Sequence, residues 1–347
     1  MPTPPDPLLL AAGRIQDGHG SLAPVADARA RLEAAGARIA DLRLATLRDG
    51  WGPAEDAAGT RFRSGASPIL ALVRAQQLLR DGTADAVVIH GRDHLATGYG
   101  ADERRALMAI YPVRSIPEAY TDLTRAFCAR HGIAAGAYLA LRDALLDNHA
   151  RALAELGRDR PQGAALLRPV TELLRRVDCA NPVVDLEAAV ILARPDREPG
   201  PPAARITLRA AAVHTCAGDV DTIARYDHLA ATVAEVEATA GVGIAGAFHE
   251  GSARIEAYTC YPPVPLAFLL ATRIAAGPAD LGAALAGPPI TVTGGMNYGR
   301  AAWNLPALNG LVALVERLAT GRERYAVVHG NGGLGELQGV ALLERAP

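Results

Sequence analysis

The sequence contains no lysine, and all 35 of its basic residues apart from histidine are arginine. This absence excludes Schiff-base enzymes, pyridoxal-phosphate enzymes and P-loop nucleotide-binding proteins, because each of them needs a lysine amine. Cysteine is scarce, and the four residues, Cys128, Cys179, Cys216 and Cys260, include no CxxC pair. They therefore indicate neither a zinc ribbon nor a disulfide framework.

Strong net charge and long apolar runs are also missing. The net charge of −2 gives no sign of a nucleic-acid surface or a membrane-binding patch. No apolar run approaches the length of a membrane-spanning helix, and the N-terminal MPTPPDPLLLAAGR lacks the basic region of a signal peptide. We therefore expect a cytoplasmic protein with no nucleic-acid or membrane partner. Half of the 347 residues are hydrophobic, which suffices for two domains or two repeated halves.

The most informative stretch is ITVTGGMNYGRAAWNLPALNGLVALVERL, which begins at Ile290. Its first four residues are apolar and β-branched, which predicts a short buried strand. Gly294 and Gly295 then allow a tight turn. From Asn304, apolar residues at spacings of three and four predict a helix, with Asn304 as N-cap and Pro306 in the first turn. Strand, loop and helix together predict a polar pocket at a positive helix end.

This stretch resembles the thiolase superfamily, in which a strand runs into Gly-Gly, a loop with a catalytic Gly-His-Pro, and a helix. TVTGGMNYG is closer to the thiolase-like acetyl-CoA acetyltransferases and sterol-carrier-type thiolases, whose loop typically reads TVTGGLPYFGGPGNN. The unit SGASPILALVRAQQLLRDGTADAVVIHG resembles the helix that carries the nucleophilic cysteine in thiolases, followed by its strand. Here Ser67 suits an N-cap and Pro68 the first helical position, which predicts a helix to about Asp81.

Further segments extend the resemblance over most of residues 60–345. DNHARAL resembles the family's NHRNA, and LLRRVDCANPVVDLEAAVILA resembles its strand with D-C-x-P. IEAYTCYPP resembles DLYSCFP, which reads HDCF in sterol-carrier-type thiolases. Since HGRDH, which starts at His90, has metal-like spacing but no third ligand in view, we expect no metal site.

The resemblance implies an α/β protein with the thiolase fold, in which two related βαβαβ halves are arranged in five layers. The first half spans 1–215, with a helical lobe inserted at about 92–175, and the second half spans 216–347. The implied oligomer is a homodimer that pairs edge strands near residue 60. An OB-fold, zinc-ribbon protein or a thiolase is a possible partner subunit.

The usual catalytic residues of the family are absent from the matching positions. An ungapped count places the nucleophilic cysteine at Gly65 and the Gly-His-Pro histidine at Arg300. The second cysteine falls near Gly330, beside His329, and the histidine of HDCF is replaced by Tyr258. We expect the segments that carry these positions to converge on one pocket.

Several roles remain open for these side chains. Tyr258 is a candidate to donate a hydrogen bond to an enolate or to transfer a proton. Alternatively, it is a packed aromatic residue. Arg300 is a candidate to bind an oxyanion and to lower the Tyr258 pKa, or else part of the pocket wall. His329 is a candidate base or a structural histidine. The residues with expected catalytic roles are Tyr258, Arg300 and His329. The residues expected to bind substrate are Ser64, Gly65, Ser67, Cys260, Gly294, Gly295, Asn304, Asn331 and Gly332.

The resemblance implies a thiolase-like protein that handles acyl-CoA, of the acetyl-CoA acetyltransferase-like acyltransferase class. It would make or break a carbon–carbon bond on a CoA thioester without the cysteine nucleophile, and with no cofactor beyond its CoA substrate. One alternative is a retro-aldolase that acts with an OB-fold, zinc-ribbon partner. Another is a catalytically silent subunit of a thiolase-type complex.

Overall fold

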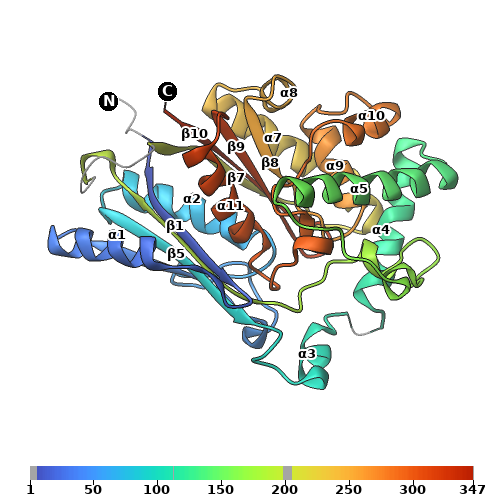
Figure 1. Cartoon of the computed structure of the whole chain (residues 1–347), viewed down its shortest axis with the longest axis horizontal. Helices are drawn as coiled ribbons and strands as arrows, with labels where there is room; N and C mark the ends of the chain where they lie inside the picture. Colours follow the sequence, from blue (N-terminus) through green and yellow to red (C-terminus); the bar gives the residue numbers. More distant parts are fainter. Residues whose placement is uncertain (1–5, 112, 198–204, 347) are drawn as a thin grey trace.

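The protein is described by a computed structural model that covers residues 6–111, 113–197 and 205–346. Within these residues the strands form one ten-stranded sheet (Figure 1) in the order β4-β3-β5-β6-β1-β7-β10-β9-β8, with β2 paired to β1. The strands before residue 200 are β1 (Leu8–Gln16), β2 (His19–Ser21), β3 (Ile39–Leu44), β4 (Arg61–Phe62), β5 (Ala86–His94) and β6 (Asp185–Ala193). Those after it are β7 (Ile206–Thr215), β8 (Ala253–Glu256), β9 (Tyr325–Gly332) and β10 (Leu337–Arg345).

The sheet consists of two halves with the same strand order. The first contains β3-β5-β6-β1 and the second β8-β9-β10-β7. In each half the first pair of strands is parallel and the next two pairs are antiparallel. Two related halves are thus present although the sequence shows no repeat. Because β7 occupies the place of β1, the second half begins at β7, and the expected boundary at residue 216 moves back to the connection after β6.

Two helices form the middle layer between the half-sheets. These are α2 (Ser67–Arg80) and α11 (Pro306–Thr320), which contact each other and strands of both halves. Both start with a proline in the first turn, where the missing N–H is not needed. Because α11 lies between two sheets, it is buried almost all round, from Pro306 to Val315.

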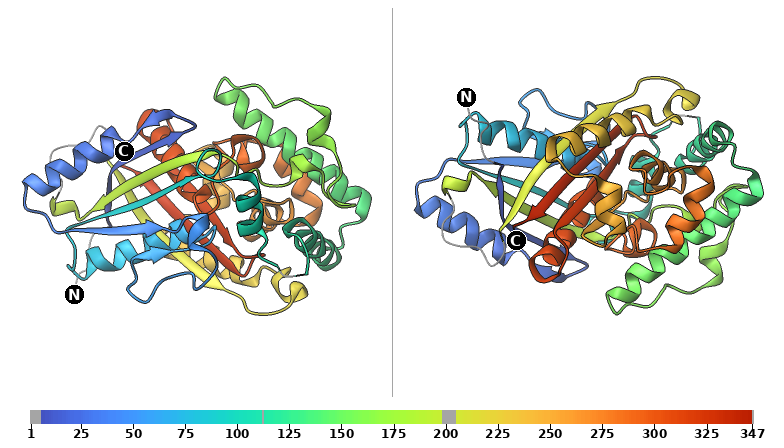
Figure 2. Two further views of the ribbon diagram at one scale, coloured as in Figure 1. Left: turned by 90° about the horizontal axis from the view of Figure 1, so that it is seen from below. Right: turned by 90° about the horizontal axis from the view of Figure 1, so that it is seen from above.

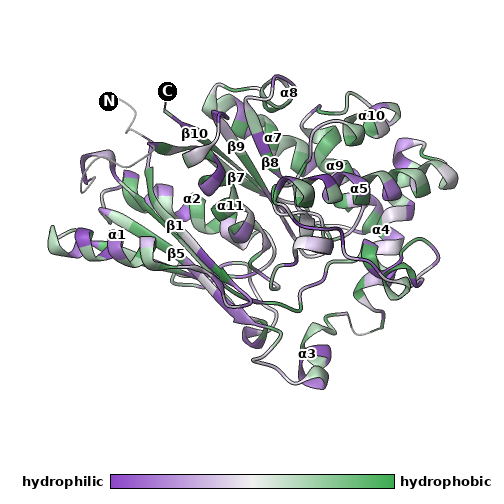
Figure 3. Cartoon of the chain, in the orientation of Figure 1, coloured by the Kyte–Doolittle hydropathy of each residue, from purple (hydrophilic) through white to green (hydrophobic). Residues whose placement is uncertain are grey.

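The outer layers complete a five-layered arrangement, as expected for the thiolase fold. Helix α1 (Ala23–Ala34) covers β1 and β6, and α7 (Asp227–Ala240) covers β7 and β10. The two views of Figure 2 show these helices on the outer faces of the sheet. In Figure 3 hydrophobic green is prominent on the central strands, while α1 on the periphery alternates between green and hydrophilic purple.

The helical lobe is inserted between β5 and β6. It contains α3 (Ala101–Met108), α4 (Ile116–His131) and α5 (Ala135–Glu155). Although it belongs to the first half by sequence, α4 contacts α6 (Val220–Ile223) and α9 (Pro263–Ala271), and α5 contacts α10 (Leu281–Ala286). Figure 1 shows α4 and α5 beside α9 and α10. The short helix α8 (Ile244–His249) lies between α7 and β8 in the sequence. The lobe therefore joins the two halves on the side where the candidate site lies.

The predicted strand at residues 290–293 is wrong. This segment is irregular, because its backbone N–H groups bind side chains rather than a neighbouring strand. The Ile290 N–H donates to Asn148 Oδ1 at 2.9 Å. The N–H groups of Val292 and Thr293 both donate to Glu256 Oε2, at 2.7 and 3.1 Å.

Two predicted N-caps are also wrong. The residue before α11 is Leu305, and the Asn304 side chain instead accepts from the Ser64 N–H at 3.0 Å and donates to the Ala45 carbonyl at 2.7 Å. The residue before α2 is Ala66, so that Ser67 is already helical. Polar residues near these helix ends thus tie distant segments together rather than cap their own helix.

The edge at β4 is covered by the chain itself. The Arg63 N–H donates to the Ala54 carbonyl at 2.8 Å, and the Asp56 N–H donates to the Arg61 carbonyl at 3.0 Å. These groups lie on the side of β4 that does not face β3, so residues 54–56 occupy the ladder that a partner strand would use. Pairing of edge strands near residue 60, which the resemblance implies for a homodimer, has no free edge here. Among the described residues, no helix is both long and apolar enough to span a membrane.

Glu256 supports the irregular segment from a buried position. Its carboxylate also contacts Thr293 Oγ1 at 2.5 Å, and it lies against α11, where a Cβ atom on Gly310 would overlap it. Burial raises the pKa of Glu256 to about 7. The hydrogen bonds from Thr293 and Val292 lower the pKa, but their effect is smaller than that of burial. The side chain therefore takes up a proton on folding between about pH 4.5 and 7.

This shift predicts a pH-dependent stability that Glu256→Gln removes. Because the pKa is higher in the folded state, the wild type loses stability as pH rises from about 4.5 to 7, by roughly 3 kcal/mol in total. Glutamine keeps an oxygen for the two N–H groups but does not titrate. Urea unfolding of both proteins from pH 4.5 to 8 measures the difference between their free energies of unfolding. The contributions of the other titrating groups cancel in this difference. Parallel stability curves would contradict the assignment.

The covered edge predicts that the purified chain does not dimerise through β4. Chemical cross-linking at micromolar concentration, followed by mass spectrometry, should give no cross-links between chains at residues 49–63. A dimer whose cross-links map to residues 49–63 would show that the loop moves away and exposes the edge.

Candidate functional site

One cavity of about 750 Å³ lies where the two halves meet the lobe. Its walls come from the N-terminal end of α2, the segment after β8, the loop before α11 and the end of β9. Residues of the lobe within 101–111 and 114–117 supply another wall. The expected convergence of the four matched segments on one pocket is thus present.

Six of the expected site residues line this cavity and six do not. Those that line it are Ser64, Gly65, Tyr258, Cys260, Asn304 and Asn331. Those placed elsewhere are Ser67, Gly294, Gly295, Arg300, His329 and Gly332.

The Tyr258 hydroxyl lies against Gly65, the residue that the resemblance aligns with the nucleophile. A Cβ atom at Gly65 would overlap the Tyr258 hydroxyl oxygen and the Asn331 carbonyl oxygen. No side chain therefore fits at residue 65, and the phenol lies against the backbone where a thiol would begin. Glycine is required here by close approach.

Neither Tyr258 nor Cys260 is ionised at neutral pH. Burial, and then the nearby Cys260, raise the pKa of Tyr258 well above its ordinary value. Burial likewise raises the pKa of Cys260 to about 12, although its hydrogen bond with Tyr120 lowers it. Since the thiolate is the reactive form of cysteine, Cys260 is an inert thiol and Tyr258 is a hydrogen-bond donor.

A directed chain of hydrogen bonds runs behind the cavity wall. The Tyr258 backbone N–H donates to His329 Nδ1 at 3.3 Å, so His329 must donate from Nε2 to Gln338 Oε1 at 2.8 Å. Gln338 Nε2 then donates to Asn331 Oδ1 at 2.6 Å. Asn331 Nδ2 donates to the Tyr120 hydroxyl at 3.2 Å.

The chain ends at a backbone group. The Tyr120 hydroxyl donates to the Gly333 carbonyl at 2.9 Å and lies 3.5 Å from Cys260 Sγ. Because Tyr258 N–H can only donate, it fixes the direction of every bond after it. The cavity wall formed by Asn331 and Tyr120 is therefore rigid, and its polar groups are already satisfied.

His329 belongs to this support and does not face the cavity. It is fully buried, and its ring stacks on Phe268 with the centroids 4.6 Å apart. Burial lowers its pKa to about 4, so it is neutral near pH 7. Both ring nitrogens have partners, which leaves none to accept a proton from a ligand in the cavity.

Arg300 is also directed away from the cavity. Its guanidinium pairs with Asp17, in the hairpin of β1 and β2, and donates to the Val183 carbonyl at 3.1 Å. The expectation that Arg300 lowers the Tyr258 pKa is therefore wrong. Arg300 fastens the loop before α11 to the first half.

Ser64 has a strained backbone at the cavity wall. Its φ of 98° is in the left-handed region, which costs a residue other than glycine about 1–3 kcal/mol. Asn304 holds this conformation through the Ser64 N–H. A Cβ atom on Gly332 would approach Ser64 Oγ to 2.7 Å, so Gly332 provides room for the serine rather than contacting a ligand.

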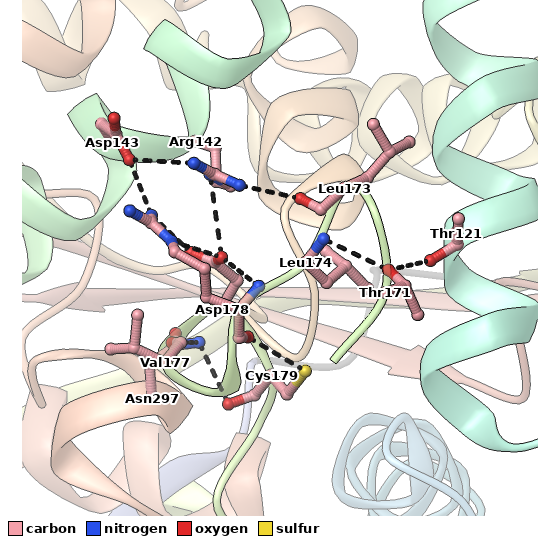
Figure 4. Close-up of polar contacts among 11 residues, drawn as sticks. Thr121, Arg142, Asp143, Thr171, Leu173, Leu174, Val177, Asp178, Cys179 and Asn297 are labelled. Carbon is pink, nitrogen blue, oxygen red and sulfur yellow. Dashed lines mark hydrogen bonds and ion pairs between the residues drawn. The ribbon is translucent and has the colours of Figure 1, made fainter. Parts of the chain in front are cut away.

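The Gly294–Gly295 turn is supported by the lobe. Both residues have positive φ, and Cβ atoms there would approach Leu153 and Thr259 Oγ1. In the next turn, Asn297 donates to the carbonyls of Val177 and Cys179, as Figure 4 shows.

An ion-pair cluster fixes the segment around Val177 and Cys179, whose carbonyls accept the hydrogen bonds from Asn297 (Figure 4). Arg175 binds Asp178 through two nitrogens, both at 2.9 Å, and reaches Asp143 on α5 at 2.7 Å. Asp178 is almost fully buried, and Arg142 lies 3.7 Å from it. The lobe thus positions the turn that brings Met296 to the cavity.

The sequence did not single out the aromatic and basic walls of the cavity. Tyr120 stacks on Tyr261 with the centroids 3.9 Å apart, and Trp51 meets Trp303 edge to face. Among the described lining residues there is no aspartate, glutamate or histidine. No group of three or more potential metal ligands occurs in the described part of the chain.

Comparisons with known proteins identify the fold. A monomeric SCP2-thiolase-like protein type 1 from Mycobacterium smegmatis superposes with a TM-score of 0.72 at 19% identity, over 100% of this chain and 79% of that one. The Ltp2-ChsH2(DUF35) aldolase gives a TM-score of 0.67 at 16% identity, over 98% of both chains. The chain has the thiolase fold. Human mitochondrial 3-ketoacyl-CoA thiolase gives 0.61 at 15% identity, over 98% of this chain and 99% of that one.

These similarities confirm the thiolase resemblance at the level of the fold. No protein-family model and no curated protein sequence matches the chain. At the position that the resemblance assigns to the nucleophile, this chain has Gly65, with the Tyr258 phenol beside it.

The close contact at residue 65 predicts an intolerant position. Gly65→Ala should lower the free energy of unfolding by about 1–3 kcal/mol, because the new methyl group overlaps Tyr258 and the Asn331 backbone. Gly136→Ala in α5 is the matched control, since its Cβ atom meets nothing within 4 Å. Urea unfolding measures both variants. Equal stability of Gly65→Ala and wild type would show that the phenol moves freely.

Proposed function

We propose that this chain binds an acyl-CoA thioester and takes part in making or breaking a carbon–carbon bond without an acyl-enzyme. The observation that carries this proposal is the Tyr258 hydroxyl, which occupies the volume beside Gly65 where the family places its nucleophile. A cysteine that accepts an acyl group has no space there. Chemistry that needs only polarisation of the thioester remains possible.

The cavity suits the two parts of an acyl-CoA. Its inner wall is aromatic and apolar, with Tyr261, Met296 and Tyr120 buried against the second half. Its solvent-facing wall carries Arg104, Arg105 and Arg114. Arginine binds phosphate well, so we propose that these side chains bind the CoA phosphates while the acyl chain lies inside.

The reaction class that fits best is a retro-aldol cleavage of a β-hydroxyacyl-CoA. The bond between the α and β carbons breaks, the β carbon becomes a carbonyl, and an enolate forms on the thioester. The proton lost from the β-hydroxyl ends on the α carbon of the shorter acyl-CoA. Tyr258, protonated because burial raises its pKa, donates a hydrogen bond to the enolate oxygen.

The cavity lacks a base for the β-hydroxyl among the described residues that line it. This favours a second protein that completes the site. The similar structure, the Ltp2-ChsH2(DUF35) aldolase, is named for two proteins. For this chain, the resemblance implies a partner of the OB-fold, zinc-ribbon type. A chain that binds the thioester but leaves all catalysis to its partner is the alternative.

The absence of an acyl-enzyme is directly measurable. We expect the intact mass of the protein to be unchanged after incubation with acetyl-CoA and with longer acyl-CoAs. A thiolase with its cysteine nucleophile is the positive control. A stoichiometric acyl adduct on Cys260 or Ser64 would restore a ping-pong transferase mechanism.

Tyr258→Phe tests the role of the phenol. With its partner present, the variant should turn over a β-hydroxyacyl-CoA about 10²–10⁴ times more slowly than the wild type, because it loses one proton-donating group. Tyr325→Phe, at the start of β9 and outside the cavity lining, is the matched control. Equal rates would exclude Tyr258 from the chemistry. No turnover by wild type with any CoA thioester would favour the silent subunit.

A further inference from the structure

Ser64 lines the cavity with a hydroxyl group that can donate a hydrogen bond. Its Oγ accepts a hydrogen bond from the Ala66 N–H at 3.3 Å, and its own N–H is held by Asn304. No described residue accepts a hydrogen bond from the Ser64 hydroxyl. The serine therefore has its acceptor role filled and its donor role open, on a wall that faces the ligand space.

The strain at Ser64 is maintained by several contacts. Asn304 pins the residue from the loop before α11, and Gly332 leaves space for its oxygen from β9. The hydrogen bond to Asn304 thus fixes the strained backbone, and the absence of a side chain at residue 332 makes room for it. Strain that is over-determined in this way marks functional positions.

Tyr258 provides a second open donor next to Gly65. The residue is only 7% exposed, and the structure shows no hydrogen bond from its hydroxyl to any described residue. Its oxygen lies against Gly65, one residue from Ser64. Both hydroxyls flank the N-terminal end of α2, a 14-residue helix whose dipole favours negative charge.

We infer that the Ser64 and Tyr258 hydroxyls together bind the thioester oxygen of the acyl-CoA. This assignment rests on the proposed function and specifies its geometry. Two neutral donors at a positive helix end suit an oxygen that gains charge as an enolate forms. They hold the carbonyl where a nucleophile would otherwise attack the neighbouring carbon.

The test compares two ligands that differ only in this oxygen. One is a saturated acyl-CoA, which has no β-hydroxyl and cannot be cleaved. The other is its thioether analogue, in which a methylene replaces the carbonyl. Calorimetric titration of wild type, Ser64→Ala and Ser64→Gly measures affinity for both. Ser64→Gly also relieves the backbone strain, so a loss common to both variants comes from the hydroxyl.

We expect both Ser64 variants to bind the thioester about five- to tenfold more weakly, as loss of one neutral hydrogen bond implies, and the thioether unchanged. Ser252→Ala, in the turn before β8, is the control and should alter neither affinity. The inference would be overturned if the Ser64 variants lost affinity equally for both ligands, or for neither. Acyl-CoA binding by the wild type would remain intact in either case. Binding of neither ligand by the wild type would instead overturn the proposed function, and the inference with it.

Discussion

The close approach of Tyr258 to the N-terminal end of α2 constrains the rest of the site. Residue 65 must be glycine because the phenol and the end of β9 leave no room for a Cβ atom. That packing requires a rigid segment after β8, and the hydrogen bond from the Tyr258 N–H to His329 provides it. The chemistry available to the cavity follows from this contact, since a phenol in a buried, apolar setting keeps its proton.

The polar residues around the cavity form two groups. One group supports the cavity wall from behind, and the other faces the space for a ligand. His329, Gln338 and Asn331 satisfy one another in a single direction. Glu256 does the same for the segment at residues 290–293, and Arg300 for the loop before α11. The open donors on the inner wall include the hydroxyl groups of Ser64 and Tyr258, which donate to no described residue. The site is therefore suited to polarising an oxygen and poorly suited to removing a proton unaided.

The fold was predicted through the resemblance of several segments to thiolase motifs. Spacing by itself predicted individual helices such as α11, whose apolar residues recur every three or four positions. Matching motifs then placed Gly65 and Tyr258 together. The segment at residues 290–293 has the composition of a strand, but the Glu256 carboxylate competes for its N–H groups, and no local pattern reveals that contact.

Side-chain direction is what the sequence could not give. His329 lies next to the expected position in β9, yet its ring points to the face away from α2, where Gln338 and Phe268 surround it. Arg300 falls at the expected count, but Asp17 lies some 280 residues earlier in the chain and draws it away. Tyr120 comes from the inserted lobe, whose docking on the second half brings it to Asn331.

The central claim is that a phenol and a serine hydroxyl have replaced the nucleophile as the groups that contact the thioester. A crystal structure of the protein with a saturated acyl-CoA tests it most directly. The account predicts an unmodified Ser64 and Cys260, with the thioester oxygen within hydrogen-bond distance of the Tyr258 hydroxyl. A thioester bound with its carbonyl turned away from the α2 N-terminus, or an acyl group covalently attached to the protein, would contradict it.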